Sequence, residues 1–141
     1  MKTFAYISLG LSLIVLCALF YLYAIDANPP VEILSPPSIT PTEVHGGDRA
    51  VSTTSYCKYT DASSSLTAFW RREEDGLVWE LTQRQINIST SKCGTLVLPL
   101  IIPDDMPSGN WQRVNVATYK VNPMASHTVE WQSNYITVLE K

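Results

Sequence analysis

The sequence has few of the residues from which metal centres and hydrolytic active sites are built. Its two histidines, His45 and His127, lie far apart, with no cysteine pair beside them. A zinc site needs three or four ligands, so we expect no metal and no other cofactor. No G-x-S-x-G motif is present, and the acidic pairs stand in polar turns, where they keep the turn soluble. We therefore predict that the chain is not an enzyme.

Positive charge is also scarce. Residues 26–141 carry nine Lys and Arg against thirteen Asp and Glu, a net charge of −4. The basic residues are scattered rather than gathered on a stripe, which excludes a nucleic-acid-binding surface of the usual kind. No pattern points to a small-molecule substrate, so the expected partner is an unidentified protein.

Charge is absent from residues 4–25, an apolar run of 22 residues. A helix of this length covers ~33 Å, enough for a hydrocarbon core of ~30 Å. Lys2 precedes the run and favours a cytoplasmic N-terminus. We predict a cytoplasmic end at 1–3, a transmembrane signal-anchor helix at 4–25, and a single-pass protein whose C-terminal domain is periplasmic or extracellular. Aromatic residues expected near the two membrane surfaces are Phe4, Tyr6, Tyr21 and Tyr23.

A cleaved signal peptide is the alternative interpretation of this run. Signal peptides have an apolar core of roughly 7–15 residues and a small-x-small cleavage site. The core here is longer, and the exit near Ala24 and Ala27 offers no good site. Cleavage would release a secreted soluble domain. Cys17 fits a small apolar residue inside the helix better than a lipoprotein site.

Two cysteines lie in the part that this prediction exports. An oxidising compartment lets a disulfide persist, so we predict a bond between Cys57 and Cys93. The alternative is a pair of buried free thiols.

Five of the nine prolines fall between residues 28 and 41. Proline fixes φ and lacks an amide hydrogen, so this stretch cannot be a helix. Residues 26–41 therefore form either an extended stalk or the first strand of the domain, and residues 42–141 form the domain itself.

Short runs of β-forming residues recur every 8–12 positions after residue 30, separated by turns. This spacing is typical of an all-β antiparallel sandwich, here of seven or eight strands. The run 95–102 is apolar on both faces, as in a buried strand, although Pro99 implies an edge or a bulge. Changes of apolar parity predict bulges near Ala117 and Ser133. The expected strands are 31–34, 50–59, 66–72, 77–81, 84–89, 95–102, 111–122 and 127–139.

The domain resembles immunoglobulin-like and fibronectin type III-like modules. The resemblance rests on strand spacing, on Trp70 in the third strand, and on the segment 102–111, which approaches a strand containing Tyr119. It implies a sandwich in which 50–59 and 95–102 are antiparallel neighbours. Antibody domains join other strands by their disulfide, so no family binding residues are carried over. The compact chain with one anchor is also similar to small phage- or bacterium-encoded envelope proteins.

The hairpin around Asp75-Gly76 is the predicted partner-binding element, because it combines charge and tryptophan at a protruding tip. The leading hypothesis is a non-catalytic, membrane-anchored interaction module acting outside the cytoplasm, at a host envelope if it is phage-encoded. A structural or virion membrane subunit that assembles through sheet edges is the alternative. The candidate binding residues are Arg71, Arg72, Glu73, Asp75 and Trp79.

Overall fold

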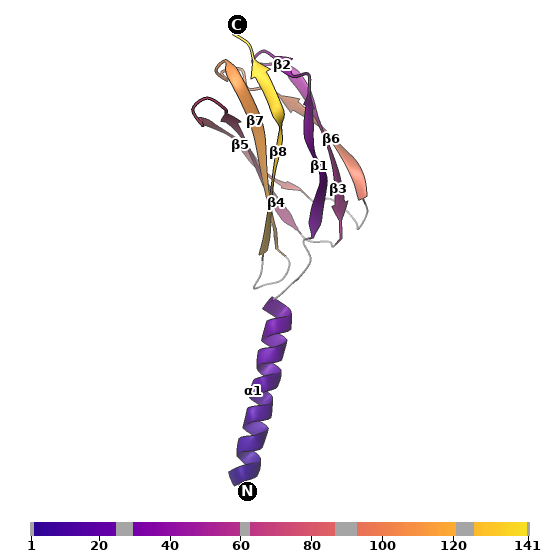
Figure 1. Ribbon diagram of the computed structural model, residues 1–141, viewed down its shortest axis with the longest axis vertical. Helices are drawn as coiled ribbons and strands as arrows, with labels where there is room; N and C mark the ends of the chain where they lie inside the picture. Colours follow the sequence, from indigo (N-terminus) through magenta and orange to yellow (C-terminus); the bar gives the residue numbers. More distant parts are fainter. Residues whose placement is uncertain (1, 25–29, 60–62, 87–92, 121–125, 141) are drawn as a thin grey trace.

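The computed structural model describes residues 2–24, 30–59, 63–86, 93–120 and 126–140, without the side chains of 2–5, 22–24, 80–82, 84 and 86. Within these ranges, one helix is followed by eight strands that form two facing sheets (Figure 1). A three-stranded sheet has the order β1-β3-β6, and a five-stranded sheet has the order β2-β8-β7-β4-β5. The elements are α1 Lys2–Ala24, β1 Val31–Thr40, β2 Glu43–Val44, β3 Arg49–Lys58, β4 Ser64–Arg72, β5 Val78–Ile86, β6 Cys93–Ile101, β7 Gly109–Lys120 and β8 Ser126–Val138.

The predicted transmembrane helix is contradicted. No helix in the described part of the chain is both long and apolar enough to cross a membrane. Tyr6 and Tyr21 are exposed, whereas the side chains of Phe4 and Tyr23 lie outside the description. The predicted single-pass topology and location are wrong with it.

The β part of the prediction agrees with the structure, with differences in detail. Residues 31–40 form β1, which pairs with β3. The predicted strands 77–81 and 84–89 are one strand, β5, over their described residues, because a register shift opposite Leu66 and Ala68 lets the chain continue. Residues 87–89 of the prediction lie outside the described ranges. The predicted bulge near Ser133 is confirmed by a register shift on β8. Ala117 pairs regularly with Val129, so the bulge predicted there is wrong.

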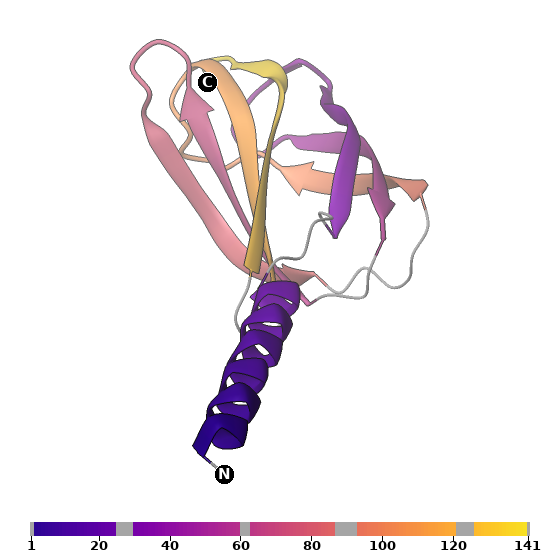
Figure 2. The same cartoon turned by 60° about the horizontal axis from the view of Figure 1, so that its bottom comes forward.

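Both sheets are curled, and they are joined along one side only (Figure 2). There the chain leaves β1, passes the cis Thr40–Pro41 peptide bond and runs as β2 parallel to β8 in the other sheet. On the opposite side, β6 and β5 are the edge strands of their two sheets. Within the described residues, the fold is therefore a half-barrel that is closed between β1 and β8 and has no strand pairing between β5 and β6.

Asn134 holds the closed side together. Its side-chain oxygen accepts from the amide of Ile39 at 2.6 Å, and its amide nitrogen donates to the carbonyl of Ile39 at 3.2 Å. Ile39 is completely buried, and unpaired backbone groups at such a position are costly. The bulge on β8 turns the Asn134 side chain towards β1, where it takes the place of backbone pairing between the two strands.

Replacing Asn134 by alanine is expected to lower the free energy of unfolding by about 1–3 kcal/mol, the cost of leaving buried backbone groups of Ile39 unsatisfied. Urea denaturation of the two proteins measures the difference. Asn134→Asp retains the acceptor but turns a second acceptor oxygen towards the carbonyl of Ile39, so it should recover little of the loss. An alanine variant as stable as the parent would show that water replaces both contacts.

Candidate functional site

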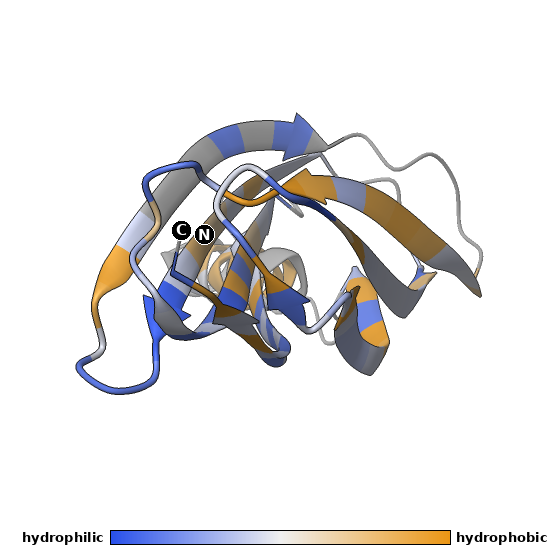
Figure 3. Ribbon diagram, turned by 90° about the horizontal axis from the view of Figure 1, so that it is seen from above, coloured by the Kyte–Doolittle hydropathy of each residue, from blue (hydrophilic) through white to orange (hydrophobic). Residues whose placement is uncertain are grey.

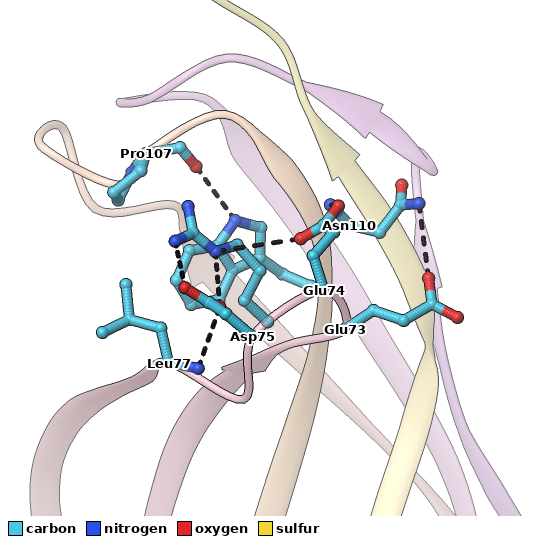
Figure 4. A network of polar contacts seen from close by, with 8 residues as sticks. Glu73, Glu74, Asp75, Leu77, Pro107 and Asn110 are labelled. Carbon is cyan, nitrogen blue, oxygen red and sulfur yellow. Dashed lines mark hydrogen bonds and ion pairs between the residues drawn. The ribbon is translucent and has the colours of Figure 1, made fainter.

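The β4–β5 hairpin tip comprises residues 72–77, and Figure 4 shows the polar contacts around its labelled residues Glu73, Glu74, Asp75 and Leu77. The ion pairs of the tip are made by Arg72. Its Nε donates to Asp75 Oδ1 at 2.8 Å, and its Nη2 forms an ion pair with the other oxygen of that carboxylate. Asp75 also accepts from the amide of Leu77 at 3.1 Å, and Gly76 has φ +70°. An aspartate followed by glycine suits this tight turn because glycine adopts positive φ at no steric cost.

The hairpin tip is fastened to the start of β7. The amide of Glu73 donates to the carbonyl of Asn110 at 2.9 Å, and the amide of Asn110 donates to Glu74 Oε1 at 3.2 Å. Gly109, at φ +138°, allows this approach, since a Cβ there would lie 3.1 Å from Arg72 Cδ and from Glu74 Oε2. The Ser108-Gly109-Asn110 sequence is thus the docking partner of the tip.

Trp111 forms the platform beneath Arg72. The guanidinium carbon lies 5.5 Å from the centre of the indole ring, within the range of a cation–π contact. The indole Nε1 donates to the carbonyl of Pro107 at 2.9 Å, and the side chain is fully buried. The charge at the tip is therefore held from below by a ring anchored in the core.

The ion pair at the tip changes the acidity of its partners. The hydrogen bonds from the Arg72 guanidinium, followed by the amide of Leu77, lower the pKa of Asp75 to about 2. The same hydrogen bond with Asp75 raises the pKa of Arg72. Arg72 is half-buried and Asp75 is exposed, and both are charged at neutral pH, so they are engaged with each other across the physiological range.

The other predicted binding residues point in different directions. Trp79 pairs with Trp70 across the strands and packs, half-buried, against the core. Arg71 donates from Nη2 to Gln112 Oε1 at 3.3 Å. The apolar side chains that the hairpin exposes are instead Leu77 and Val78. Of the candidate residues, Arg72, Glu73 and Asp75 belong to the hairpin tip, whereas Arg71 and Trp79 lie on the strands beneath it, so the five do not form a single patch.

β6 is the element whose position the sequence pattern misjudged. Its apolar residues on both faces predicted a buried strand, but it lies at the edge of the three-stranded sheet. Val97 is 58% exposed and Ile101 is 68% exposed. The edge position that Pro99 implied is confirmed, and no register shift interrupts the β3–β6 pairing.

The predicted disulfide between Cys57 and Cys93 is confirmed. These residues are directly opposite each other, at the end of β3 and the start of β6. His45 lies beside Asp48, whose Oδ2 is 3.6 Å from its Nδ1 and accepts from its amide at 2.7 Å. Within the described ranges, no three His, Cys, Asp or Glu side chains gather as a metal site would require.

Comparisons with known proteins identify a similar fold and no family. No family model and no curated protein matches the chain. In its fold, the chain is similar to the C-terminal domain of wzt. The identity is 15%, the match covers 79% of this chain and 73% of that one, and the TM-score is 0.52. At this identity the likeness concerns the fold alone.

Two other solved structures match with TM-scores below 0.5. They are the sporulation control protein Spo0M of Bacillus subtilis (11% identity, 81% of this chain, TM-score 0.48) and the DNA glycosylase AlkC of Pseudomonas fluorescens (12% identity, 76% of this chain, TM-score 0.45). The chain spans 51% and 31% of the lengths of those two proteins. The resemblance to immunoglobulin-like domains stays a prediction.

Proposed function

We propose that the chain is a non-catalytic binding module that captures an extended segment of a partner polypeptide along the edge of β6. The observation that carries the proposal is the edge itself. In the described part of the chain β6 pairs only with β3, and residues 93–101 contain no charged residue.

The β6 edge has little of the protection that natural sheets give to an open edge. Such edges are commonly blunted by lysine, by bulges or by short strands. β6 is nine residues long and pairs with β3 without interruption from Cys93 to Ile101. Pro99 is its one protective residue, and it removes a single donor. The row of backbone groups on this side suits an added strand.

The outer face of the same strand supplies apolar contacts for the partner. Val97 and Ile101 are two of its exposed side chains, and the register places Pro99 opposite Val51 on β3, which is 41% exposed. In the ribbon seen from above, β6 is coloured mostly hydrophobic, whereas the coloured stretches towards the end of β5, the edge strand across the open side, are hydrophilic (Figure 3). We therefore infer that the partner segment is uncharged and apolar at alternate positions.

A selection from a library of nine-residue peptides against the full-length chain tests the proposal. Bound peptides should share alternating apolar residues and should slow the amide exchange of β6. Val97→Lys should weaken capture at least tenfold, because lysine on an edge opposes strand addition. Gln83→Lys is the matched control, an exposed position on β5, and should leave capture unchanged.

Three results would overturn the proposal. Peptides that slow exchange at the hairpin tip instead would move the binding site to residues 72–77. Light scattering that gives a dimer without peptide, and a monomer for Val97→Lys, would make a second copy the occupant of the edge. Equal capture by the Val97→Lys and Gln83→Lys variants would exclude β6.

A further inference from the structure

The core of the half-barrel is divided into two apolar clusters. One lies towards the hairpin tip and contains Trp70 and Trp111, and the other lies towards the start of β1 and contains Val31 and Tyr119. Polar residues that point inward from both sheets lie alongside these clusters. A sandwich of this size ordinarily fills its middle with aliphatic side chains.

The polar layer consists of Ser52 and Thr54 on β3 and Arg113 and Asn115 on β7. Ser52 and Asn115 are each 7% exposed and Thr54 is 8% exposed. These four residues line one cavity together with apolar side chains of the two sheets. Burying hydroxyl and amide groups costs free energy unless they find hydrogen-bond partners, so this polar layer stabilises the core less than aliphatic side chains would.

The cavity has a volume of about 50 Å³, and with the open solvent at its mouth the empty space reaches about 620 Å³. Two of its lining residues, Leu96 and Leu98, lie on the edge strand β6 and are half-buried. The unpaired side of the half-barrel is therefore where a molecule can enter without breaking a strand pair. Other apolar lining residues are Ile33, Leu66, Ala117 and Trp131.

Arg113 gives the cavity its charge. Its guanidinium carbon lies 5.9 Å from the centre of the Trp70 ring, which supports it from one side. Among the described residues that line the cavity, the others are uncharged. A guanidinium favours a planar carboxylate, which accepts two parallel hydrogen bonds from it. The Ser52 and Thr54 hydroxyls and the Asn115 amide add further hydrogen-bonding groups.

We propose that this cavity binds a small monocarboxylate with an apolar body. The carboxylate pairs with Arg113 within the polar layer, and the hydrocarbon lies against the leucines and Trp131 towards the mouth. Such an arrangement, apolar walls with a few converging polar groups, is typical of ligand pockets. The site lies between the sheets and not on the outer face of β6, but its open side is the side on which a polypeptide would add to β6.

Octanoate is the probe, added to the full-length chain and followed by calorimetry and by tryptophan fluorescence, since Trp131 lines the cavity. Octanoate should bind, 1-octanol should bind at least tenfold more weakly, and octylammonium should not bind. Arg113→Gln should lower the affinity for octanoate at least tenfold, and Arg113→Lys should restore part of it.

A second pair of variants protects the test against misfolding of the Arg113 variants. Thr54→Leu fills the cavity from β3 while keeping the Arg113 side chain and should abolish binding. Thr53→Leu, on the exposed face of the same strand, should leave binding unchanged. Equal binding of octanoate and 1-octanol would overturn the carboxylate assignment. No binding, together with a Thr54→Leu variant more stable than the parent, would show that the layer holds only water.

Discussion

Replacing Cys57 and Cys93 together by alanine is expected to lower the free energy of unfolding by about 4 kcal/mol. The bond closes a loop with a sequence separation of 36, and constraining a loop of this length in the unfolded chain stabilises the fold by roughly that amount. Guanidinium denaturation of the oxidised parent and the double variant measures the difference. Domains of this size have total stabilities of about 5–15 kcal/mol, so the loss is a large fraction.

Because of the position of the disulfide, its removal should destabilise some strands more than others. The bond joins the end of β3 to the start of β6, and β6 has no second strand beside it within the described residues. Amide exchange in the double variant should therefore accelerate first in β6, while the β7–β8 pair remains protected. Peptide capture along β6 should weaken as well, because an edge strand that frays is a poorer template.

Cys17 provides the matched control for this experiment. It is a free cysteine on α1, so Cys17→Ser should leave the unfolding curve and the exchange pattern of β6 unchanged. A double variant within 1 kcal/mol of the parent would contradict the prediction. It would mean that the β3–β6 pairing keeps the loop closed in the unfolded ensemble even without the bond.

The sequence was most informative where a local rule acts alone. The Asp75-Gly76 turn, the parity change near Ser133 and the pairing of Cys57 with Cys93 each follow from chemistry within a few residues or from the count of cysteines. All three appear in the structure. The turn and the parity change locate a hairpin and a bulge, and the disulfide predicts the pairing of β3 with β6. The proposed binding edge depends on this pairing.

The sequence was least informative where burial depends on the curl of the whole sheet. Leu96, Val97 and Leu98 are apolar in succession, and periodicity cannot tell a central strand from an edge strand with such a run. The half-barrel leaves this strand on its open side. The polar layer was missed for a similar reason. Arg113 and Asn115 alternate with Val114 and Val116, so the pattern alone does not show which of the two sets faces inward.

The binding role predicted for the hairpin could not be judged from residue types, since Arg72 and Trp79 are equally suited to external and internal contacts. Arg72 makes an internal contact because Trp111, at the start of β7 beside the tip, places a buried ring beneath its guanidinium. This contact links a charged surface turn to the larger apolar cluster of the core.

Trp111→Ala is therefore expected to lower the free energy of unfolding by about 3–5 kcal/mol, as for other fully buried large aromatic residues. The variant loses core contacts, the hydrogen bond to Pro107 and the platform under Arg72. Trp111→Phe keeps a ring and should lose less. NMR titration gives a second readout: the pKa of Asp75, about 2 in the parent, should rise towards its ordinary value in the alanine variant as Arg72 is released. An unchanged pKa of Asp75 would show that the Arg72–Asp75 ion pair forms without the Trp111 ring and that the tip is independent of the core.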